Sequence, residues 1–151
     1  MSSAAAKWVI ASDHAGFAMK NALRDAMKGL GLPVDDLGVD SETSADYPDY
    51  AHAVAKAIHD GRAERGVLVC GSGIGVSIAA NRHAGIRAAL CHDAFTARVA
   101  RMHNDANVLC VGARIIGLGV AEDLLRVFVE TPFEGGRHQR RVEKIDPNSA
   151  A

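Results

Sequence analysis

The chain has 151 residues, of which 48% are hydrophobic and 23% are charged, and its formal net charge is −1. This balance is typical of one globular domain, and the charge provides no basic face for a nucleic acid or an anionic membrane. No apolar run approaches the roughly 20 residues that span a bilayer, and the start lacks the apolar core of a signal peptide. We expect a single domain over 1–151, with flexible tails at 1–6 and 146–151.

The three cysteines are widely spaced and form no C-x-x-C pair. This pattern disfavours a disulfide framework or a zinc knuckle, and it suits a protein of the reducing cytoplasm. No cluster of histidine, cysteine and carboxylate residues has the spacing of metal ligands. The sequence therefore predicts a cytoplasmic protein that uses no metal and no cofactor.

Short β-like runs alternate with longer helical patterns along the chain. Strands separated by helices of about 10–15 residues are typical of βαβ units, which build a mostly parallel sheet covered on both faces. We predict a doubly wound, Rossmann-like, three-layer α/β domain with five strands. The predicted strands are 7–13, 33–38, 66–70, 86–91 and 107–112, and the predicted helices are 17–30, 46–60, 74–82, 93–103, 117–130 and 136–144.

The predicted strand ends indicate where a ligand binds, because open α/β sheets bind ligands outside the carboxyl ends of their strands. The segments at those ends are 12–14, 70–72, 91–93 and 112–114, and they are polar or small where the strands are apolar. His103 precedes the last strand, so this rule does not place it.

The stretch after the third strand reads CGSGIGV and is the most informative in the chain. Its glycines expose backbone N–H groups beside a helix N-terminus, which favours an anion. It is neither G-x-G-x-x-G nor a P-loop, and Val76 stands where a thiol phosphatase would have arginine. The helix end favours the thiolate of Cys70 and makes it a better base. The alternative is that Cys70 is a small buried hydrophobe, as we expect for Cys91 and Cys110.

Arg137 and Arg141 are four residues apart and therefore lie on one face of the last predicted helix. Arg137 falls in the first turn, where a cation opposes the helix dipole. This placement favours an anion clamp, which Arg114 could join, over an ordinary solvated face. His103 and His14 are each either caps or acid–base groups.

A phosphate clamp, a thiol base, a histidine acid and an N–H cradle suit the isomerisation of a sugar phosphate without a metal. With these residues the chain resembles the type B ribose-5-phosphate isomerases and their galactose- and allose-6-phosphate relatives, from Val9 to Ile145. The segments that carry the resemblance, in order, are SDHAGFAMK, DYPDYA, CGSGIGVSIAANRHAGIRAALC, RMHNDANVLCVGARIIG and EGGRHQRRV.

The resemblance implies that Cys70 moves a proton between C1 and C2 through an ene-diolate, and that His103 opens the furanose ring. Asp13 or Ser72 would assist. It also implies a homodimer or homotetramer with sites shared between subunits, in the non-oxidative pentose phosphate pathway. It assigns the N–H groups of Gly71, Ser72, Gly73, Ile74 and Gly75 to the ene-diolate oxygen, His14, Arg114, Arg137 and Arg141 to the phosphate, and Asp13, Tyr47 and Asn104 to the sugar.

Two departures bear on this reading. Some members use a glutamate at the place of Val76 instead of the thiol, and many thiol members have threonine at the place of Ser72. The substrate alternatives are allose or galactose 6-phosphate and a tetrulose phosphate. A non-catalytic phospho-sugar-binding module would not need the thiol, and a redox-sensing thiol would need a second cysteine near Cys70.

Overall fold

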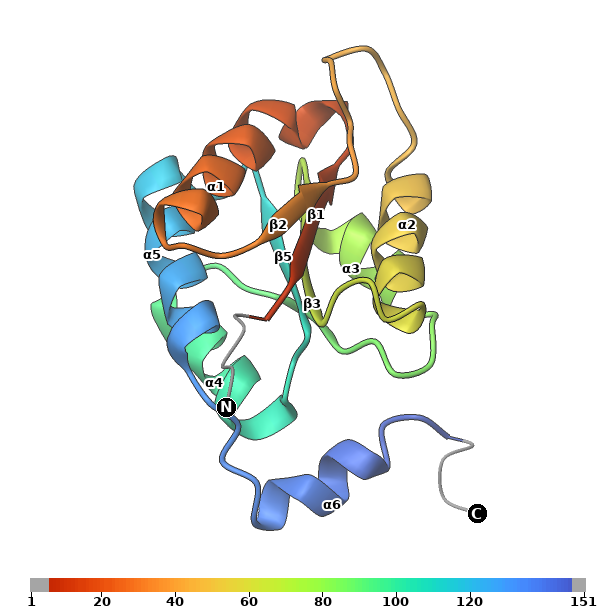
Figure 1. Cartoon of the computed structure of the whole chain (residues 1–151), viewed down its shortest axis with the longest axis vertical. Helices are drawn as coiled ribbons and strands as arrows, with labels where there is room; N and C mark the ends of the chain where they lie inside the picture. Colours follow the sequence, from red (N-terminus) through yellow and green to blue (C-terminus); the bar gives the residue numbers. More distant parts are fainter. Residues whose placement is uncertain (1–5, 148–151) are drawn as a thin grey trace.

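The computed structural model describes residues 6–147, in which five parallel strands form one sheet in the order β2-β1-β3-β5-β4 (Figure 1). This confirms the predicted α/β fold, with all strand pairs parallel. The strands are β1 (Trp8–Ser12), β2 (Val34–Asp36), β3 (Arg65–Cys70), β4 (Ala88–Leu90) and β5 (Val108–Gly112).

Six α-helices accompany the sheet in the described part of the chain, each at its predicted place with its ends within two residues of the prediction. Within residues 6–147, no helix has both the length and the apolar character of a membrane span. Most of the predicted tails lie outside the described residues, but Asp146 accepts a hydrogen bond from the N–H of Gly85. The helices are α1 (Phe17–Gly29), α2 (Tyr47–His59), α3 (Ile74–Ala80), α4 (Ala94–Asn104), α5 (Leu118–Glu130) and α6 (Arg137–Glu143).

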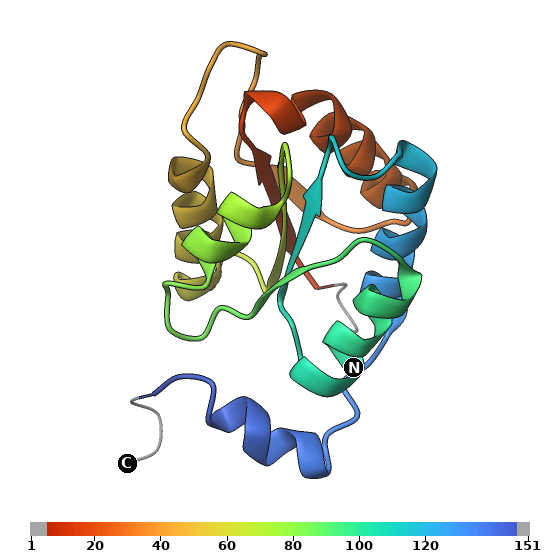
Figure 2. The ribbon, with the colours of Figure 1, turned by 180° about the vertical axis from the view of Figure 1, so that it is seen from behind.

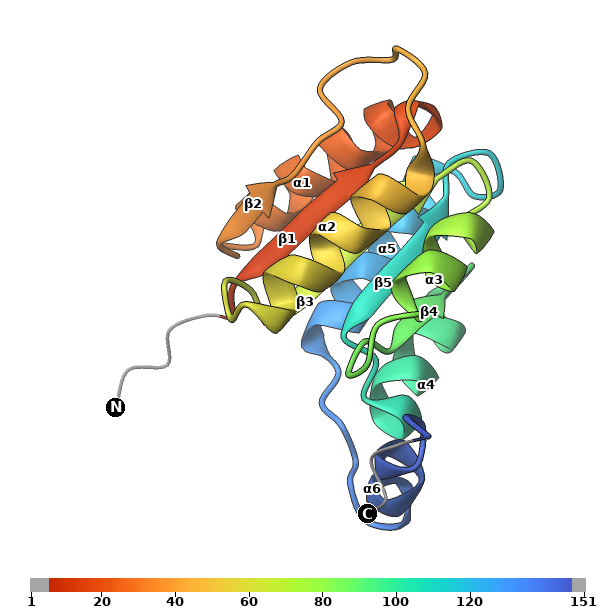
Figure 3. The same cartoon turned by 90° about the vertical axis from the view of Figure 1, so that its right-hand side faces the viewer.

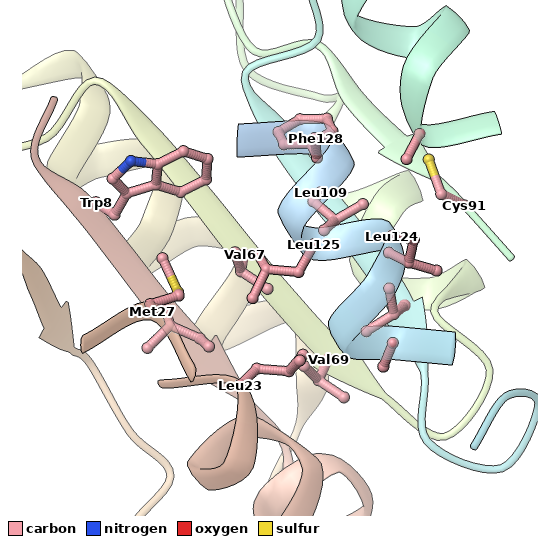
Figure 4. Packing of buried hydrophobic residues seen from close by; sticks show 14 of the residues in the cluster. Trp8, Leu23, Met27, Val67, Val69, Cys91, Leu109, Leu124, Leu125 and Phe128 are labelled. Atoms are coloured by element: carbon pink, nitrogen blue, oxygen red, sulfur yellow. The ribbon is translucent and has the colours of Figure 1, made fainter. Parts of the chain in front are cut away.

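Successive side chains of each central strand pack on opposite faces of the sheet, as the period of a strand requires. Trp8 and Ile10 pack with residues of α1, α4 and α5, whereas Val9 and Ala11 pack with residues of α2 and α3. Figures 1 and 2 show these two groups of helices on opposite faces of the sheet. Figure 4 shows the first of these cores. In β3 the same alternation turns Cys70 toward the α2–α3 side.

The strand order reverses direction next to β1, which has β2 on one side and β3 on the other. In doubly wound folds the crevice at such a switch point, outside the carboxyl ends of the strands, is where ligands bind. Here the switch point brings the residues after β1 beside those after β3, so Asp13 lies near the turn that follows Cys70.

The last helix, α6, stands apart from the two layers that cover the sheet. It lies beyond the amino ends of the strands, beside the end of α4 (Figure 3). Its side chains are mostly exposed. Residues carried by α6 are therefore at the opposite end of the sheet from the switch point.

Candidate active site

A cleft of about 620 Å³ lies at the carboxyl edge of the sheet, where the ends of β1, β3 and β5 meet the start of α2. We refer to it as the carboxyl-edge cleft. It includes most of the residues that the sequence assigned to the site. Its lining residues are Asp13, His14, Ala15, Tyr47, Cys70, Gly71, Ser72, Ile74, Gly75, Ile78, Arg114 and Ile115.

Cys70 ends β3 in the wall of this cleft and is 4% exposed. Its Sγ accepts a hydrogen bond from the N–H of Gly73 at 3.1 Å. Gly73 has φ 78°, and a Cβ there would come within 2.5 Å of Leu90, so the turn requires glycine. The turn therefore aims an N–H donor at the sulfur, where it stabilises the negative charge of a thiolate.

The backbone N–H groups of the turn are divided between the protein and the cleft. The N–H of Gly73 is used by Cys70, and the N–H of Ile74 donates to the hydroxyl of Ser72 at 3.1 Å. Of the five N–H groups assigned to the ene-diolate oxygen, those of Gly71, Ser72 and Gly75 have no partner within residues 6–147 and are available to a substrate. The resulting cradle is narrower than the sequence alone suggested.

Asp13 and His14 begin the opposite wall, in the turn that follows β1. The carboxylate of Asp13, which is 7% exposed, accepts a hydrogen bond from the N–H of Gly16 at 3.1 Å and caps a short 3₁₀ turn. His14 Nδ1 lies 3.0 Å from the amide nitrogen of Ala45 and 3.2 Å from its carbonyl oxygen. These contacts fix the ring to the segment that precedes α2.

A buried lysine, Lys20, holds the start of the connection between β2 and α2, which leads to Ala45. Lys20 is 1% exposed, and its Nζ donates to both carboxylate oxygens of Asp36 at 2.9 and 2.8 Å and to the carbonyl of Val39 at 2.7 Å. Burial by itself raises the pKa of Asp36, but hydrogen bonds from Lys20, the N–H of Gly38 and Arg24 outweigh it and lower the pKa.

Tyr47 and Arg114 flank the glycine turn. A Cβ on Gly75 would come within 2.5 Å of the Tyr47 ring, so the ring packs directly on the start of α3. A Cβ on Gly71 would meet a guanidinium nitrogen of Arg114 at 3.2 Å, and the N–H of Arg114 donates to the carbonyl of Gly71. A phenol and a guanidinium therefore border the cleft on either side of the cradle.

The other predicted site residues lie at the amino edge of the sheet. His103 and Asn104 are in the last turn of α4, and Arg137 and Arg141 are exposed on α6. Strand β5 separates the two groups, and its five residues span about 16 Å at about 3.3 Å each. Within one chain Arg114 therefore does not join the other two arginines.

Glu134 and His138, which the sequence analysis missed, lie beside His103. The His103 and His138 rings stack with centroids 4.4 Å apart and planes 16° apart. One Glu134 oxygen lies 3.3 Å from His138 Nε2 and 3.9 Å from His103 Nε2. The spacing of Glu134 and His138, four residues apart, was the available signal, but the partner on α4 is 31 residues earlier. We refer to His103, Glu134 and His138 as the amino-edge triad.

The ligand atoms of the triad lie within 4.8 Å of one another, close enough to raise the question of a metal ion. The lone pair of an imidazole nitrogen lies in the plane of its ring. Because the two rings are stacked in nearly parallel planes, one ion cannot lie on both lone pairs unless a ring turns. The geometry therefore does not fit a metal centre.

The other two cysteines lie within the core and outside the cleft, as expected. Burial raises the pKa of the Cys91 thiol to about 11 and that of Cys110 well above its ordinary value. All three thiols are unpaired. Of the three thiols, Cys70 is therefore the one that lines the cleft.

The chain is similar to known proteins in both sequence and structure. The Ribose/Galactose Isomerase family model matches residues 8–145. Ribose-5-phosphate isomerase B of Escherichia coli (strain K12) is 44% identical over 133 residues, covering 88% of this chain and 89% of that protein. D-erythrulose-4-phosphate isomerase of Pectobacterium atrosepticum is 43% identical over 137 residues, covering 90% of each.

A crystal structure of a ribose 5-phosphate isomerase from Thermotoga maritima has the same fold. It superposes with a TM-score of 0.92 at 50% sequence identity, covering 94% of this chain and 98% of that chain. The likeness thus extends over the cleft, α4 and α6 together.

Proposed function

Because this chain belongs to the Ribose/Galactose Isomerase family, we propose that it interconverts D-ribose 5-phosphate and D-ribulose 5-phosphate in the cytoplasm, as a step of the non-oxidative pentose phosphate pathway. The relatives that act on ribose 5-phosphate match nearly the whole chain in sequence and in fold. The three unpaired thiols suit a reducing compartment.

The observation that carries the proposed mechanism is the N–H of Gly73 directed at Cys70 Sγ in the wall of the cleft. As a thiolate, Cys70 takes the proton from C2 of the open-chain aldose and returns it to C1, while a proton moves from O2 to O1. The free N–H groups of Gly71, Ser72 and Gly75 hold the negative oxygen of the ene-diolate between these steps. Base and cradle supply what the proton transfer requires, so the reaction proceeds without a metal or a cofactor.

The complete site is formed by two copies of the chain. In this arrangement the carboxyl-edge cleft of one subunit receives His103, Asn104, Arg137 and Arg141 of the other. Three side chains at the rim of the cleft support it, since Ile74, Ile78 and Ile115 are 51%, 54% and 56% exposed. Apolar groups clustered around a polar cleft are typical of a surface that a partner covers. A homodimer with two equal sites follows from a two-fold axis.

Within the shared site each remaining residue has a role that its chemistry allows. His103 opens the furanose ring by proton transfer, with Asp13 or Ser72 assisting. Arg137 and Arg141 bind the phosphate from the partner's side, and His14 and Arg114 bind it from the cleft. A guanidinium group donates paired hydrogen bonds to phosphate oxygens, so the three arginines suit a phosphate dianion. The sugar hydroxyls contact Asp13, Tyr47 and Asn104.

A four-carbon substrate is the second candidate, because a relative named D-erythrulose-4-phosphate isomerase is 43% identical to this chain. The same proton transfer would act on a shorter sugar. Comparing kcat/KM for D-erythrulose 4-phosphate and D-ribose 5-phosphate separates the two: the proposal requires the larger value for the pentose. Allose or galactose 6-phosphate would enter the same comparison.

The test is to incubate the protein with D-ribose 5-phosphate in deuterated water and to follow C2 exchange and ribulose 5-phosphate by NMR. Wild type and Cys91→Ala should turn over with or without a chelator, whereas Cys70→Ala should lose about 10²–10⁴ in rate. An inactive wild type contradicts the proposed reaction and favours the binding module. A fully active Cys70→Ala contradicts only the role of the thiol.

A further inference from the structure

His103 does not stand alone at the end of α4. Its side chain is 39% exposed, and on its protein side it meets Glu134 and the ring of His138. The three side chains come from three segments: the last turn of α4, the connection that follows α5, and the first turn of α6. Because the three side chains come from separate segments, it is tertiary packing and not local sequence that brings them together.

Backbone contacts hold that connection against α4 independently of the triad side chains. The N–H of Glu134 donates to the carbonyl of Met102 at 3.1 Å. The guanidinium of Arg101, which is 2% exposed, donates to the carbonyls of Thr131 at 3.2 Å and Ala106 at 2.6 Å. Each chain therefore holds Glu134 beside His103 without a partner or a substrate. Figure 3 shows α6 beside the end of α4, where this contact is made.

His138 is unusual on its helix, because it is 7% exposed whereas most residues of α6 are exposed. Its Nε2 is buried, and within residues 6–147 it has no hydrogen-bond partner with good alignment. A Glu134 carboxylate oxygen lies 3.3 Å from this nitrogen. A leucine would fill the same space without burying a polar nitrogen, so packing alone does not account for the imidazole.

We propose that Glu134 and His138 are positioning residues for His103 in ring opening; this inference rests on the proposed function and deepens it. To open the furanose, His103 takes the proton from the anomeric hydroxyl and gives one to the ring oxygen, so it carries a positive charge between the two transfers. The Glu134 carboxylate faces its Nε2 and stabilises that charge. The stacked ring of His138 fixes the plane in which His103 turns.

The chemistry of the two sugars separates a role of Glu134 and His138 in ring opening from a purely structural role. In ribulose 5-phosphate the phosphate occupies the oxygen that would close the ring, so this ketose is open-chain. Exchange of its C1 hydrogen with deuterated water uses Cys70 and the cradle and needs no ring opening. Conversion of ribose 5-phosphate needs both.

Glu134→Gln keeps the shape of the side chain and removes its charge. We expect kcat for ribose 5-phosphate to fall about tenfold or more, with KM and the exchange at C1 of ribulose 5-phosphate each within about twofold of wild type. Glu134→Asp should restore part of the loss. His138→Ala should lower the same kcat, and His138→Phe, which keeps a stacking ring, should restore most of it. Glu130→Gln, an exposed charge change at the end of α5, is the matched control.

The outcomes separate the two proposals. If wild type acts on neither sugar, the proposed function fails and this inference fails with it. If wild type is active and Glu134→Gln converts ribose 5-phosphate normally, the inference alone is overturned. Equal losses in conversion and exchange would also overturn it, because they would indicate a general disturbance of the site rather than of ring opening.

Discussion

The two ends of the sheet carry the proposed site in different ways. At the carboxyl edge, strand ends and tight turns place Cys70, Asp13 and the glycine turn in one cleft. At the amino edge, His103 and the arginines lie on the end of α4 and on α6, at the opposite end of the sheet from that cleft (Figure 3). The first region is organised by the topology of the sheet, whereas the second has a role in the proposed site only if a second copy of the chain brings it to a cleft.

This difference divides the chemistry as well. The cleft has the groups for moving a proton between two carbons and for holding the resulting anion. The amino edge has the groups for opening a ring and for binding a phosphate. Under the proposed function a single chain would hold two half-sites, and the site of a dimer would combine one of each kind.

The largest expected effect comes from mixing two inactive variants. Cys70→Ala removes the proposed base from the cleft, and His103→Asn removes the proposed acid–base group from the amino edge. The homodimer of each variant should lose about 10²–10⁴ in rate. After joint unfolding and refolding in equal amounts, half of the dimers are mixed, and each mixed dimer has one intact site. Activity should therefore return to about a quarter of the wild-type value.

The control for this experiment is the double variant Cys70→Ala/His103→Asn refolded with Cys70→Ala. Its mixed dimers have no intact site, so no activity should return. Failure of the first mixture to regain activity, with mixed dimers confirmed by mass spectrometry, would show that each site is built within one chain.

The sequence was sufficient for the cleft because the rule that locates it is simple. Once five parallel strands are predicted, residues after β1 and β3 must meet, and Cys70 and Asp13 are read directly from those positions. It was insufficient for the amino-edge triad, because Glu134 is held beside His103 by hydrogen bonds that Arg101 and the N–H of Glu134 form with backbone carbonyls. Contacts of that kind depend on tertiary packing, which leaves no periodic pattern in the sequence.

Substitution of the arginines of α6 should have a smaller effect on activity than loss of Cys70 or His103. Arg141→Ala should raise KM for ribose 5-phosphate by about 10–100-fold, since a hydrogen bond to a charged group contributes about 1.5–3 kcal/mol. Arg140→Ala, one position earlier on the same exposed helix, should change KM by less than about twofold. Steady-state kinetics gives KM for both variants. Equal increases in KM would contradict the assignment of a phosphate clamp to α6.

Alkylation distinguishes the cleft from the core beneath it. At pH 7, iodoacetamide should modify Cys70 and inactivate the enzyme about tenfold faster than it modifies Cys91, whose pKa of about 11 keeps it a thiol. Ribose 5-phosphate should protect Cys70. Peptide mass spectrometry over a time course gives both rates. Earlier modification of Cys91 would contradict the assignment of Cys70 as the presented thiol.

The smallest effect on turnover is expected beneath the cleft, at the pair formed by Lys20 and Asp36. Asp36→Asn leaves the buried ammonium without its carboxylate, which should lower the free energy of unfolding by about 3 kcal/mol at pH 7. Turnover at 25 °C should stay within about twofold of wild type, because His14 keeps its contacts with Ala45 while the protein is folded.

The difference in free energy of unfolding between wild type and Asp36→Asn should depend on pH, because the pKa of Asp36 is lowered in the folded protein. A carboxylate whose pKa is lower in the folded than in the unfolded state contributes stability above the unfolded value, which is about 3.9, and loses it as the pH falls through the folded value. The gap between wild type and Asp36→Asn should therefore be constant from pH 5 to pH 7 and should close below about pH 4. Urea unfolding at each pH measures the free energy of unfolding of both proteins. A difference that persists undiminished at low pH would show that the charge of Asp36 is not what stabilises its contact with Lys20.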